Sequence, residues 1–212
     1  MNFKDIKTAA QAYCDRYDEE LESSIPAFMS VVIGKINNAL RTGEQSVRSQ
    51  IVMELDREYY GLPSDWGGAR DVEILKEGKQ HGRSLSYLAP PDMNKLKRKH
   101  HHHNHHKHGY YTIIADQIQV APPSAGEILE ITYYQRLQDM VNDSDSNWLC
   151  EKNPDALIFG LCTEISAFAK DDMAFASYDA RFKESLNDIT MADQVTRWSG
   201  PTMYVQVDGL IV

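Results

Sequence analysis

The sequence predicts an α+β fold: mainly a helical bundle with a β-rich insertion of short antiparallel strands and an extended C-terminal tail. Apolar residues recur every three or four positions in residues 1–46 and 147–199, the period of a helix buried on one side. Residues 47–135 alternate in twos instead and are rich in β-branched and aromatic residues, as half-buried strands are. We therefore expect 1–46 and 147–199 to form one discontinuous helical domain, 47–135 to be the insertion and 200–212 to be the tail.

Two helices are expected near the N-terminus. The first runs from Phe3 to Tyr17, and an acidic stretch at 18–22 follows it. The second opens at Ser23–Pro26, because serine caps helices and proline is tolerated in their first turn. It ends near residues 41–43, where Gly43 fits a C-terminal cap.

The stretch 147–199 predicts two consecutive amphipathic helices. The pair Asn153-Pro154 is a start signal, Asp171-Asp172 fits the start of the next helix, and Gly200-Pro201 stops it. Cys162 lies on the apolar stripe of the first of these helices, so we expect it in the core. A long helical pair with a narrow stripe needs either the rest of the chain or neighbouring copies to bury it.

The middle of the chain predicts strands joined by turns. A turn is expected at Leu62–Gly68, and Pro90–Met93 begins a short turn or helix. The expected strands lie at 50–55, around 72–74, at 85–89, 110–115, 118–121 and 127–135.

The charge of the chain is unevenly spread. The net charge is −9, but five of the 22 basic residues lie in 95–107, a stretch without an acidic residue. The rest of the chain therefore carries 17 basic residues against 31 acidic ones. Such a body repels nucleic-acid phosphates rather than binding them.

Hydropathy and cysteine usage limit the class of protein further. No apolar run approaches the roughly 20 residues that span a bilayer, so we expect no membrane partner. The N-terminal residues lack the apolar segment of a signal peptide. The three cysteines form no spaced pattern, which favours reduced thiols and a cytosolic origin.

A histidine- and lysine-rich segment at 95–108 interrupts the β-rich insertion. We interpret it as a flexible, solvated loop, because its cationic neighbours oppose metal binding and no rigid element holds the imidazoles. The alternative is a metal- or polyanion-binding module that acts through residues 97–108. The candidate metal ligands are His100, His102, His105 and His108.

Catalytic motifs are missing from the sequence. It has no phosphate-binding loop, no nucleophile elbow and no His-Glu-x-x-His zinc motif. His81, in a glycine-rich turn, is the one histidine outside the 95–108 segment. We therefore expect neither an enzyme nor a cofactor.

Four local patterns, taken in order, resemble the head-to-tail adaptor (connector) proteins of tailed bacteriophages. They cover nearly all of residues 8–200, and the departures are the His/Lys-rich segment and the tail after Gly200. The patterns are Ile25–Met29 running into Lys35–Arg41; Leu62–Trp66 before a strand; the hairpin Tyr110–Pro122 with Leu129–Tyr134; and Asn147–Leu149 with Pro154-Asp155 and Phe159-Gly160, leading to a last helix that closes at Arg197–Gly200.

The resemblance implies a structural protein of the virion neck or tail, assembled in the host cytoplasm. Such adaptors form a ring, usually of twelve copies, under the portal. They extend the DNA channel without sequence-specific binding and present a platform for the tail tube, nozzle or fibres.

Residue assignments follow from this hypothesis. We expect copies to assemble laterally through the 154–198 helices, the tail to dock on the portal and the β-rich insertion to face the phage tail. The expected subunit-interface residues are Phe175, Tyr178, Arg181 and Phe182, and the expected portal-binding residues are Tyr204, Val205, Val207, Leu210, Ile211 and Val212.

Overall fold

The computed structural model describes residues 1–76, 82–99, 109–123 and 125–197. The chain divides into two compact units: Met1–Glu44 with Leu137–Val212, and Gln45–Arg136. We call them the helical unit and the β unit. Of the described residues 50% are helical and 24% lie in strands, so the α+β class is confirmed, whereas "mainly a helical bundle" is not.

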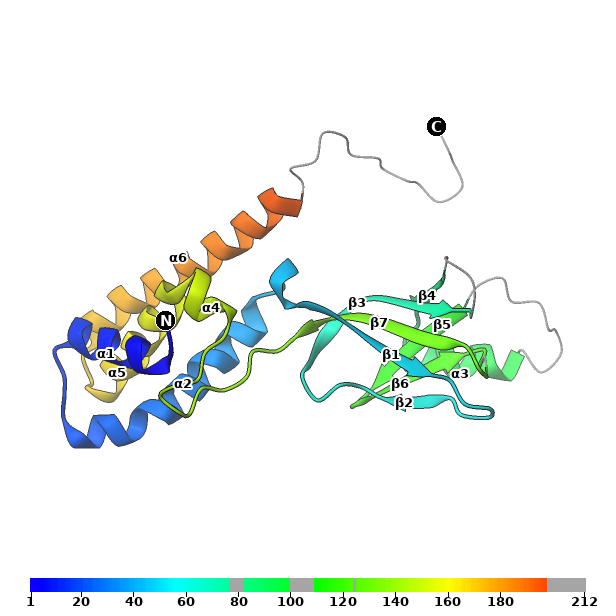
Figure 1. Cartoon of the computed structure of the whole chain (residues 1–212), viewed down its shortest axis with the longest axis horizontal. Helices are drawn as coiled ribbons and strands as arrows, with labels where there is room; N and C mark the ends of the chain where they lie inside the picture. The colour runs from blue at the N-terminus through cyan, green and yellow to red at the C-terminus, as the bar shows by residue number, and fades with distance from the viewer. Residues whose placement is uncertain (77–81, 100–108, 124, 198–212) are drawn as a thin grey trace. The chain divides into compact units, whose positions relative to one another are not determined.

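The helical unit is built around its fourth helix. It contains α1 (Phe3–Cys14), α2 (Glu19–Ala39), α4 (Trp148–Lys152), α5 (Pro154–Phe168) and α6 (Asp172–Arg197). Helix α5 contacts each of the other four (Figure 1). Its central position explains why it is the most apolar of them, with Leu157, Leu161, Cys162 and Ile165 fully buried. The expectation that Cys162 belongs to the core is confirmed.

Helix α2 begins earlier than predicted. The Asp18 side chain accepts a hydrogen bond from the Leu21 amide at 3.0 Å and caps the helix. The acidic stretch is its first turn, where carboxylates are favoured by the positive helix end, and Pro26 lies inside the helix. The helix ends at Ala39, and Gly43 opens a 3₁₀ turn, η1 (Gly43–Gln45), instead of capping α2.

The helix boundaries around 147–172 follow local capping chemistry. Asn147 caps the short helix α4, which was not predicted, by accepting from the Leu149 and Cys150 amides. Asp171 accepts from the Ala174 amide at 3.0 Å, so the predicted start of α6 is confirmed. Lys170, between α5 and α6, adopts a left-handed conformation with φ of 58°.

The β unit is a seven-stranded sheet in the order β1-β7-β3-β4-β5-β6-β2. All pairs are antiparallel except β4 and β5, which are parallel. The strands are β1 (Ser46–Val52), β2 (Tyr59–Gly61), β3 (Trp66–Leu75), β4 (Arg83–Tyr87), β5 (Gly109–Ile114), β6 (Gln117–Ala121) and β7 (Ile128–Gln135), and the α-helix in the described residues of this unit is α3 (Pro90–Lys99).

Two sequence predictions about this unit are corrected by the structure. The strands are not all antiparallel, because α3 lies between β4 and β5 and gives the crossover that a parallel pair needs. Residues 95–99 are not loop but the second half of α3, which starts at Pro90-Pro91 with Asp92 in its first turn. Residues 100–108 lie outside the described part.

One apolar core holds the β unit together. Its buried side chains come from strands across the sheet order, from Ile131 on β7 to Tyr60 on the last strand, β2, and the partly buried Ile51 of the first strand, β1, packs against them. The sheet therefore curls so that one of its faces encloses the core.

Candidate interaction surfaces

Helix α6 is held to the helical unit at its N-terminal half by aromatic contacts. The Tyr178 hydroxyl donates to the Tyr13 carbonyl at 2.8 Å, and the Arg181 guanidinium lies 5.4 Å from the centre of the Phe159 ring. Phe182 is 4% exposed and packs beside Gly160. These contacts fix which side of α6 faces its own unit.

The four predicted subunit-interface residues therefore differ in what they can offer a neighbour. Phe175, 38% exposed, and Arg181 are accessible. Tyr178 is half-buried, and Phe182 belongs to the core of its own unit, so it presents no surface. The apolar periodicity in the sequence marked residues that α6 uses to pack on α5.

A different face of α6 is exposed and nearly free of charge. Seven exposed positions follow one another at steps of three or four residues, so they lie along one line of the helix. We call this line the α6 seam; it consists of Met173, Ser177, Ala180, Glu184, Asn187, Met191 and Gln194. Met173 is 86% exposed, and Glu184 is the one charged member. A face that meets only water normally carries more charge than this.

The sequence contained the signal for the seam. The same spacing of three and four residues is visible there, but it joins small, polar and methionine side chains rather than a continuous apolar stripe. Which of two stripes faces the core becomes evident only when α5 is in place.

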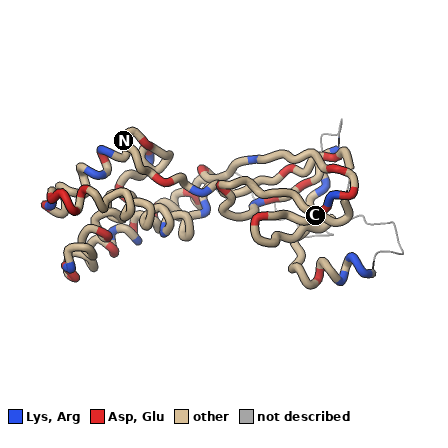
Figure 2. The backbone as a smooth tube through the Cα atoms, turned by 90° about the horizontal axis from the view of Figure 1, so that it is seen from below, with Lys and Arg blue, Asp and Glu red and all other residues tan. Residues whose placement is uncertain are grey.

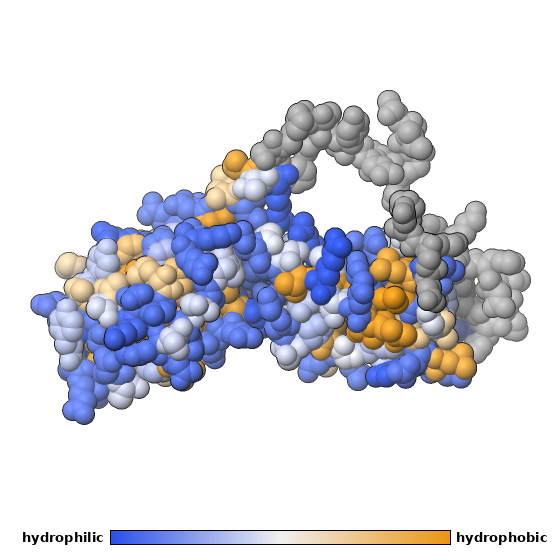
Figure 3. Space-filling model, in the orientation of Figure 1, coloured by the Kyte–Doolittle hydropathy of each residue, from blue (hydrophilic) through white to orange (hydrophobic). Residues whose placement is uncertain are grey.

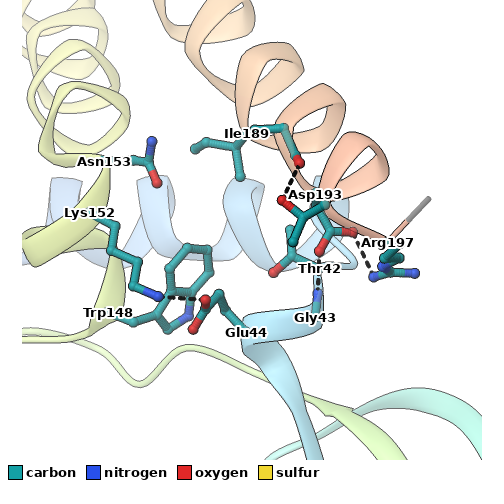
Figure 4. A pocket seen from close by; sticks show the side chains of 11 residues that line it. Thr42, Gly43, Glu44, Trp148, Lys152, Asn153, Ile189, Asp193 and Arg197 are labelled. Carbon is teal, nitrogen blue, oxygen red and sulfur yellow. Dashed lines mark hydrogen bonds and ion pairs between the residues drawn. The ribbon is translucent and has the colours of Figure 1, made fainter. Parts of the chain in front are cut away.

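The C-terminal end of α6 borders a pocket of about 280 Å³, formed together with α4 and η1 (Figure 4). Trp148, Ile189 and Ala192 give it apolar walls. An ion pair between Lys152 Nζ and Glu44 Oε1, 2.5 Å apart, lies at its rim.

Asp193 connects this end of α6 to the distant η1 turn. Its Oδ1 accepts a hydrogen bond from the Gly43 amide at 2.6 Å, and its Oδ2 lies 2.7 Å from Arg197 Nη2. Arg197 also donates to the Arg41 carbonyl at 3.2 Å. The last described turn of α6 is therefore fixed, and the chain continues from the pocket into 198–212. The predicted portal-binding residues, 204–212, lie outside the described part.

The β unit exposes apolar side chains. On the face shown in Figure 3, apolar residues gather over the β unit. Its exposed large apolar side chains are Val52, Leu55, Tyr59, Tyr87 and Ile114.

The C-terminal end of α3 carries a run of basic residues (Figure 2). Two of its cations are already engaged: Lys97 pairs with Glu58, and Lys95 with Asp92 at 2.9 Å. Hydrogen bonding to Lys97 lowers the pKa of Glu58. The candidate metal ligands His100, His102, His105 and His108 lie outside the described residues. Within those residues no group of three or more potential ligands could hold a metal ion.

Among the helices of the described part, none is both long and apolar enough to cross a bilayer.

A family model described as SU10 adaptor protein matches residues 1–204 of the chain. The match includes all of the β unit and all the described helices. No curated protein matches the chain.

Proposed function

Because the chain belongs to the SU10 adaptor protein family, a family of phage head-to-tail adaptors, we propose that it forms a ring that joins the portal to the tail. The observation that carries this proposal is the family match over both structural units. In the ring, each copy extends the channel through which DNA leaves the capsid. The chain is assembled in the host cytoplasm and acts as a structural part of the neck, not as an enzyme.

Lateral assembly through α6 accounts for the α6 seam. A helix face with one charge in seven exposed positions loses little hydration when a neighbouring copy covers it. In a ring each subunit presents two different surfaces, one to each neighbour. Arg181 is exposed beside the seam, four residues after Ser177, and contributes at the edge of this contact. Phe175 is exposed too, but it shares its side of α6 with Phe182.

Attachment to the portal is assigned to residues 201–212. The support is positional: α6 is fixed up to Arg197 beside the pocket, and the segment follows Arg197 closely in the sequence. Its residues from Tyr204 to Val212 are mostly apolar and alternate weakly, which suits a segment that adds a strand to a partner or fills a groove.

The β unit is assigned to the tail side of the ring. Its exposed apolar side chains, among them Val52, Leu55 and Tyr87, suit a platform for a tube, nozzle or fibre protein. The acidic balance of the chain suits a channel wall along which DNA slides without sticking.

Negative-stain imaging of the chain mixed with its portal tests the ring directly. We expect an added ring at the narrow end of the portal, of twelve copies. Deleting 201–212 should abolish this attachment while the circular dichroism of the subunit stays unchanged. Normal attachment of the truncated chain would remove the docking role from this segment.

The lateral contact is tested by Met191→Glu, which places a charge on the α6 seam. The matched control is Thr190→Glu, an exposed neighbour that lies off the seam. We expect the seam variant to lower ring yield on the portal and the control to leave it unchanged. Equal yields for both variants would show that another surface makes the contact.

A further inference from the structure

Two cysteines face each other where α1 packs against α5. Cys14 is the last residue of α1, and its Sγ lies 4.0 Å from the carbonyl oxygen of Cys162. The Sγ of Cys162 lies 3.7 Å from the carbonyl oxygen of Ala10, one helical turn before Cys14. The two thiols therefore occupy one helix–helix contact, although 148 positions separate them in the chain.

Their surroundings differ in access and in charge. Cys14 is half-buried and lines a pocket of about 240 Å³, together with Arg16 and Tyr178. Cys162 is fully buried. Hydrogen bonding to the Cys162 thiol, with Ser166 and the charge of Arg16, lowers the pKa of Cys14. The same thiol contact and burial raise the pKa of Cys162. Cys14 is thus the thiol that both ionises and meets solvent.

We propose that Cys14 and Cys162 are a redox pair, which a low-molecular-weight disulfide converts into an intramolecular disulfide bond. The Cys14 thiolate attacks one sulfur of the reagent, forms a mixed disulfide and releases one thiolate. Cys162 then attacks the Cys14 sulfur, and its proton passes to the second reagent thiolate, which departs as a thiol. The two protein thiols lose two electrons, and the reagent disulfide gains them.

The position of Cys14 at the end of a helix favours the bond. Because Cys14 ends α1 and is followed by Asp15 in a left-handed conformation, only the last turn of α1 has to adjust. The bond would close a long stretch of chain and fasten α1 to α5. Cross-links of that kind stabilise by restricting the unfolded chain, so the melting temperature should rise by several degrees.

The third cysteine provides an internal control. Cys150 is fully buried in α4, and its Sγ lies 3.5 Å from Met140 Sδ. Burial also raises the pKa of Cys150. It should therefore remain a free thiol while the other two react.

The test is to incubate the folded full-length chain with oxidised glutathione and analyse it by intact mass and non-reducing peptide mapping. We expect the mass to fall by two hydrogens and one cross-linked peptide pair to contain Cys14 and Cys162. A persisting glutathione adduct on Cys14, a bond that includes Cys150, a link between two chains or no reaction would each overturn the proposal.

Two variants separate the roles of the thiols. Cys162→Ala should trap one glutathione on Cys14, because nothing resolves the mixed disulfide. Cys14→Ala, at the accessible end of α1, should take up no glutathione and should not rise in melting temperature on oxidation. If Cys14→Ala still forms an intramolecular bond, the assignment of the pair is wrong. This proposal is independent of the adaptor function, since it is read from mass and melting rather than from ring assembly.

Discussion

Replacing Asp193 by alanine should loosen the C-terminal end of α6. In the structure the Asp193 carboxylate accepts a hydrogen bond from the Gly43 amide, with 2.6 Å between Oδ1 and the amide nitrogen. It also forms an ion pair with Arg197, whose Nη2 lies 2.7 Å from Oδ2. A hydrogen bond to a charged group contributes about 1.5–3 kcal/mol, and an ion pair four residues apart on a helix adds about 0.3–0.5 kcal/mol. Alanine recovers up to about 0.7 kcal/mol through its helix propensity. The expected net cost is about 1–3 kcal/mol.

Amide hydrogen exchange of the last two turns of α6 is the most direct measurement. A local cost of about 1–3 kcal/mol corresponds to exchange that is roughly 5- to 150-fold faster in these turns. Asp193→Asn keeps an acceptor for the Gly43 amide but loses the charge, so its effect should be intermediate.

The matched control is Asp188→Ala, which removes an exposed carboxylate from the same helix. It should change the free energy of unfolding by no more than about 0.5 kcal/mol. If Asp188→Ala and Asp193→Ala accelerate exchange equally, or if neither does, then Asp193 does not hold α6 to the η1 turn.

The other predictions concern the cores of the two units. Burial and the hydrogen bond to Asp65 raise the pKa of Tyr133 to about 12, so stability present below about pH 10 should fall by about 3 kcal/mol towards pH 12. Urea titrations of Tyr133→Phe should lack this fall. Gly160→Ala should cost about 1–3 kcal/mol in urea, because its Cβ would lie 2.6 Å from a core methyl group. Asn37→Ala should lower the free energy of unfolding by about 2–4 kcal/mol, because the buried amide and carbonyl of Leu137 lose their hydrogen bonds to the Asn37 side chain.

Each of these predictions has an outcome that contradicts it. Tyr134→Phe, next to Tyr133, is the control for the alkaline titration; a Tyr133→Phe chain that still loses the full 3 kcal/mol would show that other groups dominate. A Gly160→Ala chain as stable as the original would mean that the contact with Val32 relaxes freely. An Asn37→Ala chain as stable as the original would show that the Leu137 amide and carbonyl do not depend on Asn37.

The sequence predicted those boundaries of α5 and α6 that local chemistry determines. Pro154 and Asp171 act within one turn of their own helix, so neighbouring residues are enough to place them. Helix α4 was missed because five residues are too few to show a helical period. Pro26 misplaced the start of α2, since a proline that fits a first turn can also be accommodated inside a helix.

The structural features that the sequence did not predict depend on contacts between residues far apart in the chain. The Gly43 amide finds its acceptor 150 positions away, and no local pattern announces that contact. The parallel pairing of β4 with β5 follows from the position of α3, and not from the alternation within either strand. Long-range packing also explains why Phe182 was wrongly expected at a subunit interface. The more apolar stripe of α6, which includes Phe182, packs into the core of its own unit.

Arg181 allows the contact of α6 with a neighbour to be separated from its contact with its own unit. Within the unit its guanidinium lies over the Phe159 ring, which contributes at most about 1 kcal/mol at an exposed site. Arg181→Ala removes only that contribution, whereas Arg181→Glu also reverses the charge beside the α6 seam. If this side of α6 meets a neighbouring copy, the glutamate variant should lower ring yield on the portal well beyond the alanine variant, while their urea midpoints stay similar. Equal ring yields for the two variants would place Arg181 outside the contact, because a charge reversal within a packed interface cannot be silent.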